Sequence, residues 1–63
     1  MRKDELFTGV KVWCWWKSRY LYYTGTVSRG KYKFVDDLDA ITMIAEKDLM
    51  KLKKATHKAE LQP

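Results

Sequence analysis

Alternation between apolar and polar side chains, broken at short intervals by turn-forming residues, is the feature that most restricts the fold of this chain. Val10, Val12 and Cys14 share one parity along the chain. A period of two residues predicts a β-strand with one buried face. We therefore expect a strand over residues 9–16 that directs these three side chains into a core and the intervening Trp side chains outward.

The same pattern continues through most of the chain. Residues 20–27 are rich in aromatic and β-branched side chains, which favour strands, and Gly25 among them indicates a bulge or a close approach of another backbone segment. Turns are predicted at 28–30, where Gly30 adopts positive φ at little cost, and at 36–39, where Asp side chains close local hydrogen bonds. The expected strands are residues 9–16, 20–27, 31–35, 40–45 and 49–51, with a single helical turn at 46–48.

Five short strands in a chain of 63 residues describe one small all-β domain. A curled antiparallel barrel of the SH3-like kind removes the exposed edges that a flat sheet of this size would have. We predict an N-terminal extension at 1–6, an SH3-like five-stranded barrel at 7–52, and a basic segment at 53–63. The sequence leaves a short helix and an unstructured tail equally open for that last segment.

The residue types available argue against several classes of function. The single Cys14 and single His57 lie far apart in the sequence and match neither a zinc site nor a nucleophilic pair. The Asp residues of 36–39 lack the length, central Gly and distal Glu of a calcium-binding loop. No apolar run is long enough to span a membrane. We therefore expect a binding module and not an enzyme, with no cofactor, no metal and no membrane partner.

Charge and aromatic residues are both unevenly distributed. The net charge is +5, with basic residues prevailing in 1–35 and 49–63 and acidic residues in 36–48. Two outward Trp side chains on one strand form a patch that soluble monomers usually avoid. This patch is either covered by the C-terminal segment or used as a binding or dimerisation surface. Six of the nine aromatic residues lie within 13–23: Trp13, Trp15, Trp16, Tyr20, Tyr22 and Tyr23.

Trp16 and Tyr23 are expected at the ends of two successive strands, where their rings can meet at the rim of the barrel beside the Asp residues of 36–39. An aromatic face attracts a cation by about 0.5–2 kcal/mol. A nearby carboxylate accepts the N–H of a mono- or dimethylated ammonium group. The combination predicts a cage for methylated lysine.

Several motifs occur in the order and spacing typical of one family. Together they cover about three quarters of the chain, and the stretch resembles a tudor domain, most closely those of DNA-damage checkpoint mediators. The resemblance implies a five-stranded barrel that binds methylated lysine, commonly on a histone tail, within a scaffold protein of the nucleus. The motifs are Phe7–Val12, Trp16, Tyr22–Val27, Gly30–Asp37 and Lys47–Leu49.

The resemblance also implies a set of site residues. Trp16 matches the cage Trp at the end of the first strand, and Tyr23 matches the Tyr before a Ser/Thr-Gly pair. Asp37 is the favoured cage acid. The sequence departs from the family pattern after the third strand, where Val35 replaces a Phe, unless a shift brings in Phe34, and where a Tyr is missing. The candidate cage residues are Trp16, Tyr23, Phe34, Asp36, Asp37 and Asp39.

Two alternatives remain open. The same barrel could bind DNA, with cations on the phosphates and aromatic rings stacked on bases, and such binding would depend strongly on salt. Alternatively, the domain is a protein–protein module, either half of a tandem tudor pair or a self-associating unit that buries Trp13 and Trp15. The candidate nucleic-acid-binding residues are Lys17, Arg19, Arg29, Lys31 and Lys33.

Overall fold

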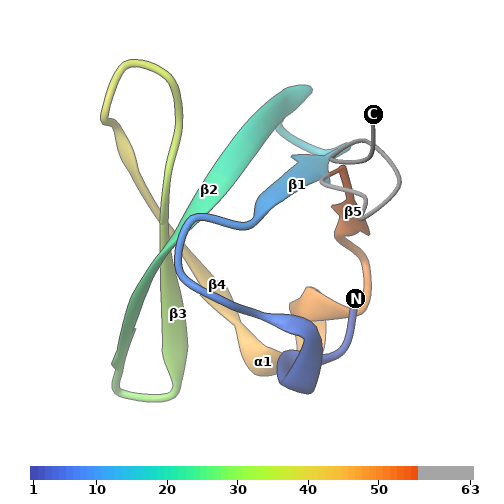
Figure 1. Cartoon of the computed structure of the whole chain (residues 1–63), viewed down its shortest axis with the longest axis vertical. Helices are drawn as coiled ribbons and strands as arrows, with labels where there is room; N and C mark the ends of the chain where they lie inside the picture. The colour runs from blue at the N-terminus through green and yellow to red at the C-terminus, as the bar shows by residue number, and fades with distance from the viewer. Residues whose placement is uncertain (56–63) are drawn as a thin grey trace, which may run out of the picture.

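The computed structural model describes residues 1–55 and shows a small, mostly β fold (Figure 1). Five strands and two single helical turns are present in this part of the chain. They follow in the order η1 (Lys3–Glu5), β1 (Lys11–Cys14), β2 (Arg19–Ser28), β3 (Lys31–Val35), β4 (Ile41–Ala45), α1 (Glu46–Leu49) and β5 (Lys53–Lys54).

All five strands belong to one antiparallel sheet with the order β4-β3-β2-β1-β5. The all-β prediction is therefore confirmed, as an open five-stranded sheet whose outermost strands are β4 and β5. β2 is the central strand in this order, with β1 and β5 on one side and β3 and β4 on the other. Figure 1 shows that the sheet is strongly twisted, so that β4 crosses the view and ends at α1. The two ends of β2 therefore belong to different parts of the fold.

The predicted bulge in β2 is confirmed. Tyr23 pairs with Phe34, but the register shifts before Val27 pairs with Tyr32. Gly25 lies within this interval at φ +89°, and a Cβ atom placed there would lie 2.5 Å from the Thr8 hydroxyl oxygen. Both the backbone angle and the close approach of the N-terminal segment therefore require Gly at this position.

The β2–β3 turn is also as predicted. Ser28 pairs with Lys31, so only Arg29 and Gly30 form the loop. Both have positive φ, 52° and 77°. A two-residue hairpin loop with both central residues in this region has the twist that matches its flanking strands.

The predicted parity of the first strand is confirmed, because its three apolar side chains are completely buried. They pack with residues from β2, β3, β4, α1 and the segment before β5, and each fully buried large apolar side chain contributes about 1.5–3 kcal/mol. The core consists of Val10, Val12, Cys14, Leu21, Tyr23, Phe34, Ile44, Leu49 and Leu52.

Two expectations near the C-terminus are wrong. Leu49 does not begin a strand but ends α1, where its side chain is buried in the core. The fifth strand starts at Lys53, and the following Ala55 amide donates to the Lys11 carbonyl at 2.8 Å. The sequence alone also favours Met43 and Met50 as core residues because both are large and apolar, but they are 40% and 76% exposed.

Part of the predicted C-terminal helix or tail falls on β5, which is neither. The rest of that prediction, residues 56–63 with His57, lies outside the described residues.

Candidate ligand-binding face

The outward face of the sheet is unusually rich in aromatic side chains because of how β1 and β2 pair. Trp13 lies directly opposite Tyr20, and Lys11 lies opposite Tyr22. Buried neighbours alternate with these residues in both strands, so all four side chains project from the other side of the sheet. We refer to Lys11, Trp13, Tyr20 and Tyr22 as the outer face.

The rings of the outer face contact one another and a cation. Trp13 and Tyr20 meet edge-on, with centroids 4.8 Å apart and planes at 63°. The Lys11 ammonium lies 4.4 Å from the centroid of the Tyr20 ring. Tyr20 remains 43% exposed, so this ring is fixed by two neighbours and still accessible to a ligand.

Further cations and apolar groups border the outer face. Lys53 of β5 lies opposite Trp13 on the side away from Tyr20. On the other side, Val35 pairs with Tyr22 and in turn with Ile41 of β4, which is 59% exposed. A mixed basic and apolar surface therefore continues across the whole sheet.

The β1–β2 turn extends this surface with two more indole rings. Trp15 and Trp16 are 60% and 37% exposed and meet edge-on, with centroids 5.4 Å apart. The turn is closed by hydrogen bonds from the Lys17 amide to the Cys14 carbonyl and from the Ser18 amide to the Trp15 carbonyl, each 3.2 Å. Lys17 is exposed beside these rings.

Asp36 fastens this turn to the turn between β3 and β4. One of its carboxylate oxygens accepts the amides of Leu38 and Ala40 at 2.8 and 2.9 Å, and the other accepts the Arg19 guanidinium at 2.8 Å. The hydrogen bond from the Ala40 amide, followed by those from Leu38 and Arg19, lowers the pKa of Asp36. This carboxylate is only 7% exposed, and both of its oxygens already accept hydrogen bonds.

A shallow hollow of about 270 Å³ lies where the two turns meet. The lining includes the Arg19–Asp36 ion pair together with Tyr20 and Asp37. It is lined by Ser18, Arg19, Tyr20, Asp36, Asp37 and Leu38.

The structure does not gather the candidate cage residues into one place. Tyr23 is 9% exposed and packs on Phe34, with centroids 5.3 Å apart, and Phe34 is completely buried. Both are core residues because they follow the inward parity of β2 and β3. Among residues 1–55, the ring in contact with Trp16 is that of Trp15 and not that of Tyr23, which differs from the expected pairing. Asp37 and Asp39 are exposed in the β3–β4 turn.

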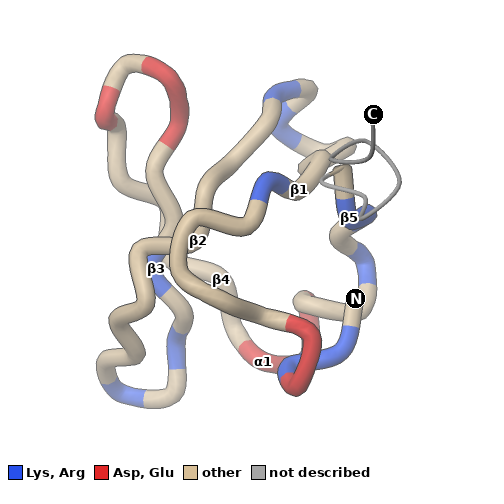
Figure 2. Tube along the Cα trace, in the orientation of Figure 1, with Lys and Arg blue, Asp and Glu red and all other residues tan. Residues whose placement is uncertain are grey.

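The candidate nucleic-acid-binding residues divide into separate groups. Figure 2 shows basic segments at the β1–β2 turn and at the β2–β3 turn, at opposite ends of the molecule. Lys17 and Arg19 belong to the first, and Arg29 and Lys31 to the second, while Lys33 lies farther along β3 opposite Met43. Only the first group adjoins the exposed Trp residues.

The sequence did not predict that Lys11, Tyr20 and Tyr22 share one face with Trp13. Parity placed Trp13 outward, but only the register between β1 and β2 shows that Tyr20 is its partner. Aligning the alternating patterns of residues 9–16 and 20–27 with each other could have predicted this pairing. The ion pair between Arg19 and Asp36 joins residues 17 positions apart and has no such signal.

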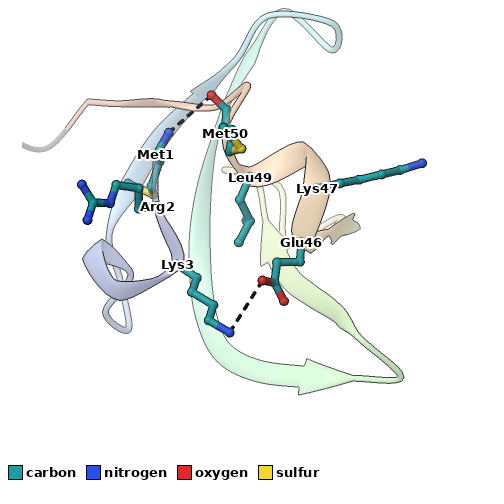
Figure 3. A pocket seen from close by; sticks show the side chains of 7 residues that line it. All are labelled: Met1, Arg2, Lys3, Glu46, Lys47, Leu49 and Met50. Carbon is teal, nitrogen blue, oxygen red and sulfur yellow. Dashed lines mark hydrogen bonds and ion pairs between the residues drawn. The ribbon is translucent and has the colours of Figure 1, made fainter.

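A larger hollow of about 490 Å³ lies between the N-terminal segment and α1 (Figure 3). Lys3 and Glu46 form an ion pair at 3.6 Å across it, while the Lys47 side chain extends away from it. Its other lining residues are Met1, Arg2, Leu49 and Met50.

Neither hollow contains a cluster of metal-ligating side chains, and none of three or more such residues occurs within residues 1–55. No helix in that part of the chain is long and apolar enough to cross a membrane. No family model, no curated protein and no solved structure matches this chain.

Proposed function

We propose that this protein is a binding module for single-stranded nucleic acid, which it contacts through the outer face and the β1–β2 turn. The observation that carries this proposal is the adjacency of exposed rings and cations. The Lys11 ammonium lies 4.4 Å from the centroid of the Tyr20 ring, and Lys17 directly follows the exposed Trp15 and Trp16 in the β1–β2 turn. Bases stack on such rings for about 1–3 kcal/mol each, while cations contact the phosphates.

The net charge of +5 supports the same proposal. Phosphate contacts release counterions, so affinity is expected to fall steeply as the salt concentration rises. Single strands are favoured over duplex because a stacked base must leave its own helix to reach the rings. Chromatin and the nucleus remain the proposed setting, as the tudor resemblance implies.

We propose that the open sheet is that of an SH3-like, tudor-type barrel. Three features support this proposal. The long strand β2 has a bulge at Gly25 and pairs with both β1 and β3. A single helical turn precedes the last strand, and that strand, β5, pairs with β1.

The test uses the fluorescence of the three Trp residues, all of which lie in or beside the proposed site. We expect a short thymidine oligonucleotide to quench this fluorescence and to bind more tightly than a duplex of the same length. Raising the salt from about 50 mM to about 200 mM is expected to weaken binding by at least tenfold. Absence of binding at low salt, or binding without quenching, would contradict the proposal.

A second candidate function is recognition of a methylated lysine. The hollow between the two turns favours it, because it combines the Tyr20 ring with the carboxylates of Asp36 and Asp37. A methylated ammonium would have to displace the Arg19 guanidinium from this site. An NMR titration with mono-, di- and trimethylated histone peptides tests it, with shifts expected at Tyr20 and Asp37. Shifts that are absent, or that an unmodified peptide reproduces, would remove this candidate.

A further inference from the structure

The two edges of the sheet are protected to very different degrees. Within residues 1–55, β5 has two residues, both Lys, and short charged edges discourage pairing with another chain. β4 presents five residues, Ile-Thr-Met-Ile-Ala, without a charge, a Pro or a bulge. Among the described strands, β4 pairs only with β3 and is outermost in the sheet. Its outer edge therefore has the features of a strand that accepts a partner.

The hydrogen bonds at the start of β4 show which residues face this edge. In an antiparallel pair, alternate residues direct their backbone groups toward the neighbouring strand. The Asp36 amide donates to the Ala40 carbonyl at 3.1 Å, so Ala40 faces β3, and Thr42 and Ile44 follow it by alternation. Ile41, Met43 and Ala45 then direct their amide groups away from the sheet.

The contacts between β3 and β2 indicate the same alternation of backbone directions. The Lys33 carbonyl accepts the Thr24 hydroxyl at 2.9 Å, so it faces β2 and not β4. Its partner across the β3–β4 pair is Met43. Met43 is thus at the centre of the unpaired edge.

We propose that β4 is a dimerisation edge that pairs antiparallel with β4 of a second copy of this chain, about a two-fold axis at Met43. This register places Ile41 opposite Ala45 of the second copy, and the two Met43 side chains opposite each other. Ile41 and Met43 are 59% and 40% exposed in the single chain and would become covered. The contact is isologous, as in most two-fold dimers.

Charge complementarity favours a second copy over an unrelated strand. The same antiparallel contact brings the start of β4, which Asp39 precedes in the β3–β4 turn, beside the end of β4 in the second copy, which Lys47 follows in α1. Within residues 1–55 neither side chain has an ion-pair partner, and Lys47 extends away from the body of the protein (Figure 3). The two-fold axis produces this acid–base pair twice. The interface is independent of the proposed nucleic-acid site, which occupies β1 and β2.

The first experiment measures sedimentation velocity over a range of protein concentrations. We expect a reversible monomer–dimer equilibrium that shifts strongly toward monomer in Met43→Lys, which places two cations opposite each other. Val27→Lys is the matched control, because Val27 is also an exposed strand residue but lies on β2. Far-UV circular dichroism of both variants verifies folding. A monomer at every concentration, or a dimer insensitive to Met43→Lys, would overturn the proposal.

A charge exchange tests the register without touching the apolar contact. Asp39 and Lys47 lie beyond opposite ends of β4, whose end residues are about 13 Å apart, and no ion pair joins the two side chains within residues 1–55. Asp39→Lys and Lys47→Asp each place like charges opposite each other and should weaken self-association by roughly tenfold. An equimolar mixture of the two variants restores opposite charges at both ends and should dimerise as tightly as the original protein. A mixture no tighter than either variant alone would refute this pairing.

Discussion

The two ends of β2 each carry two basic side chains, although Arg19 at one end is ion-paired to Asp36, and the ends differ in their aromatic surroundings. At one end, Lys17 and Arg19 adjoin the exposed rings of Trp15 and Trp16. At the other end, the β2–β3 turn carries basic residues, but its nearest ring, that of Tyr32, is half-buried against Tyr23. Charge alone attracts any phosphate chain, whereas rings beside charge also hold bases. If the protein binds single-stranded nucleic acid as proposed, we therefore expect the tighter contact at the β1–β2 end.

The strongest challenge to this comparison is removal of both exposed indoles. Trp15→Ala/Trp16→Ala should lower the affinity for a single-stranded oligonucleotide by about a hundredfold, since each lost stack costs about 1–3 kcal/mol. The melting temperature should change little because both rings lie at the surface. Fluorescence anisotropy with a labelled oligonucleotide measures the affinity. Phe7→Ala removes an exposed ring elsewhere and is the control. Equal losses in the two variants would show that the β1–β2 turn is not special.

The bulge at Gly25 separates the two ends and should be the most sensitive backbone position between them. Gly25→Ala combines an unfavourable φ with a clash against the Thr8 hydroxyl, and we expect a loss of about 1–3 kcal/mol in the free energy of unfolding. Gly30→Ala, in the β2–β3 turn, also has positive φ but open space around its Cβ, and should cost about 1 kcal/mol.

Urea unfolding measures the loss in the free energy of unfolding for each of the two Gly variants. Thr8→Ala in the Gly25→Ala background removes the hydroxyl and should recover part of the loss. If the two Gly variants are equally stable, the approach of Thr8 does not constrain the bend in β2.

Asp36 offers a pH-dependent test of the β1–β2 end. Its folded pKa is below the ordinary value of 3.8, so it stabilises the fold above that pH and loses this contribution as the pH falls. Asp36→Asn should therefore lower stability at neutral pH and flatten the decline of stability in acid. Chemical unfolding measured across the acidic range shows both effects.

The control for this experiment is Asp37→Asn, which leaves the hydrogen bonds of Asp36 in place and should retain the acid-dependent decline. An Asp36→Asn variant with the original pH profile would show that the clamp to Arg19 contributes nothing. In NMR spectra of the Asp36→Asn variant, we expect chemical-shift changes relative to the original protein near the β1–β2 turn and none at the β2–β3 turn.

Local chemistry made much of the fold predictable. Alternation located the first four strands, and Gly25 and Gly30 marked the bulge and the turn because each needs positive φ. The fifth strand was predicted at residues 49–51 but begins at Lys53. Leu49 can bury its side chain in the core equally well from a helical turn, where it lies, and from a strand. Apolar character alone does not distinguish the two.

The candidate site was harder to predict, since it depends on pairing between strands. Tyr23 and Phe34 were expected at the rim as cage residues, yet inward parity makes both part of the core. Trp16 instead contacts its own neighbour in the sequence. From the sequence alone, an aromatic residue near the end of a strand is equally compatible with the core and with the rim. Only the pairing register of the strand distinguishes the two positions.

The smallest effect is expected at the β2–β3 turn. Arg29→Gln/Lys31→Gln removes two cations but no ring, so the affinity for an oligonucleotide should fall only a few-fold, mainly through weaker long-range attraction. The slope of affinity against salt should become shallower if these residues contact phosphate, and should stay unchanged if they do not. Lys17→Gln/Lys53→Gln, with the same loss of charge beside the rings, is the matched comparison. A larger loss at the β2–β3 turn than beside the rings would reverse the assignment of the two ends.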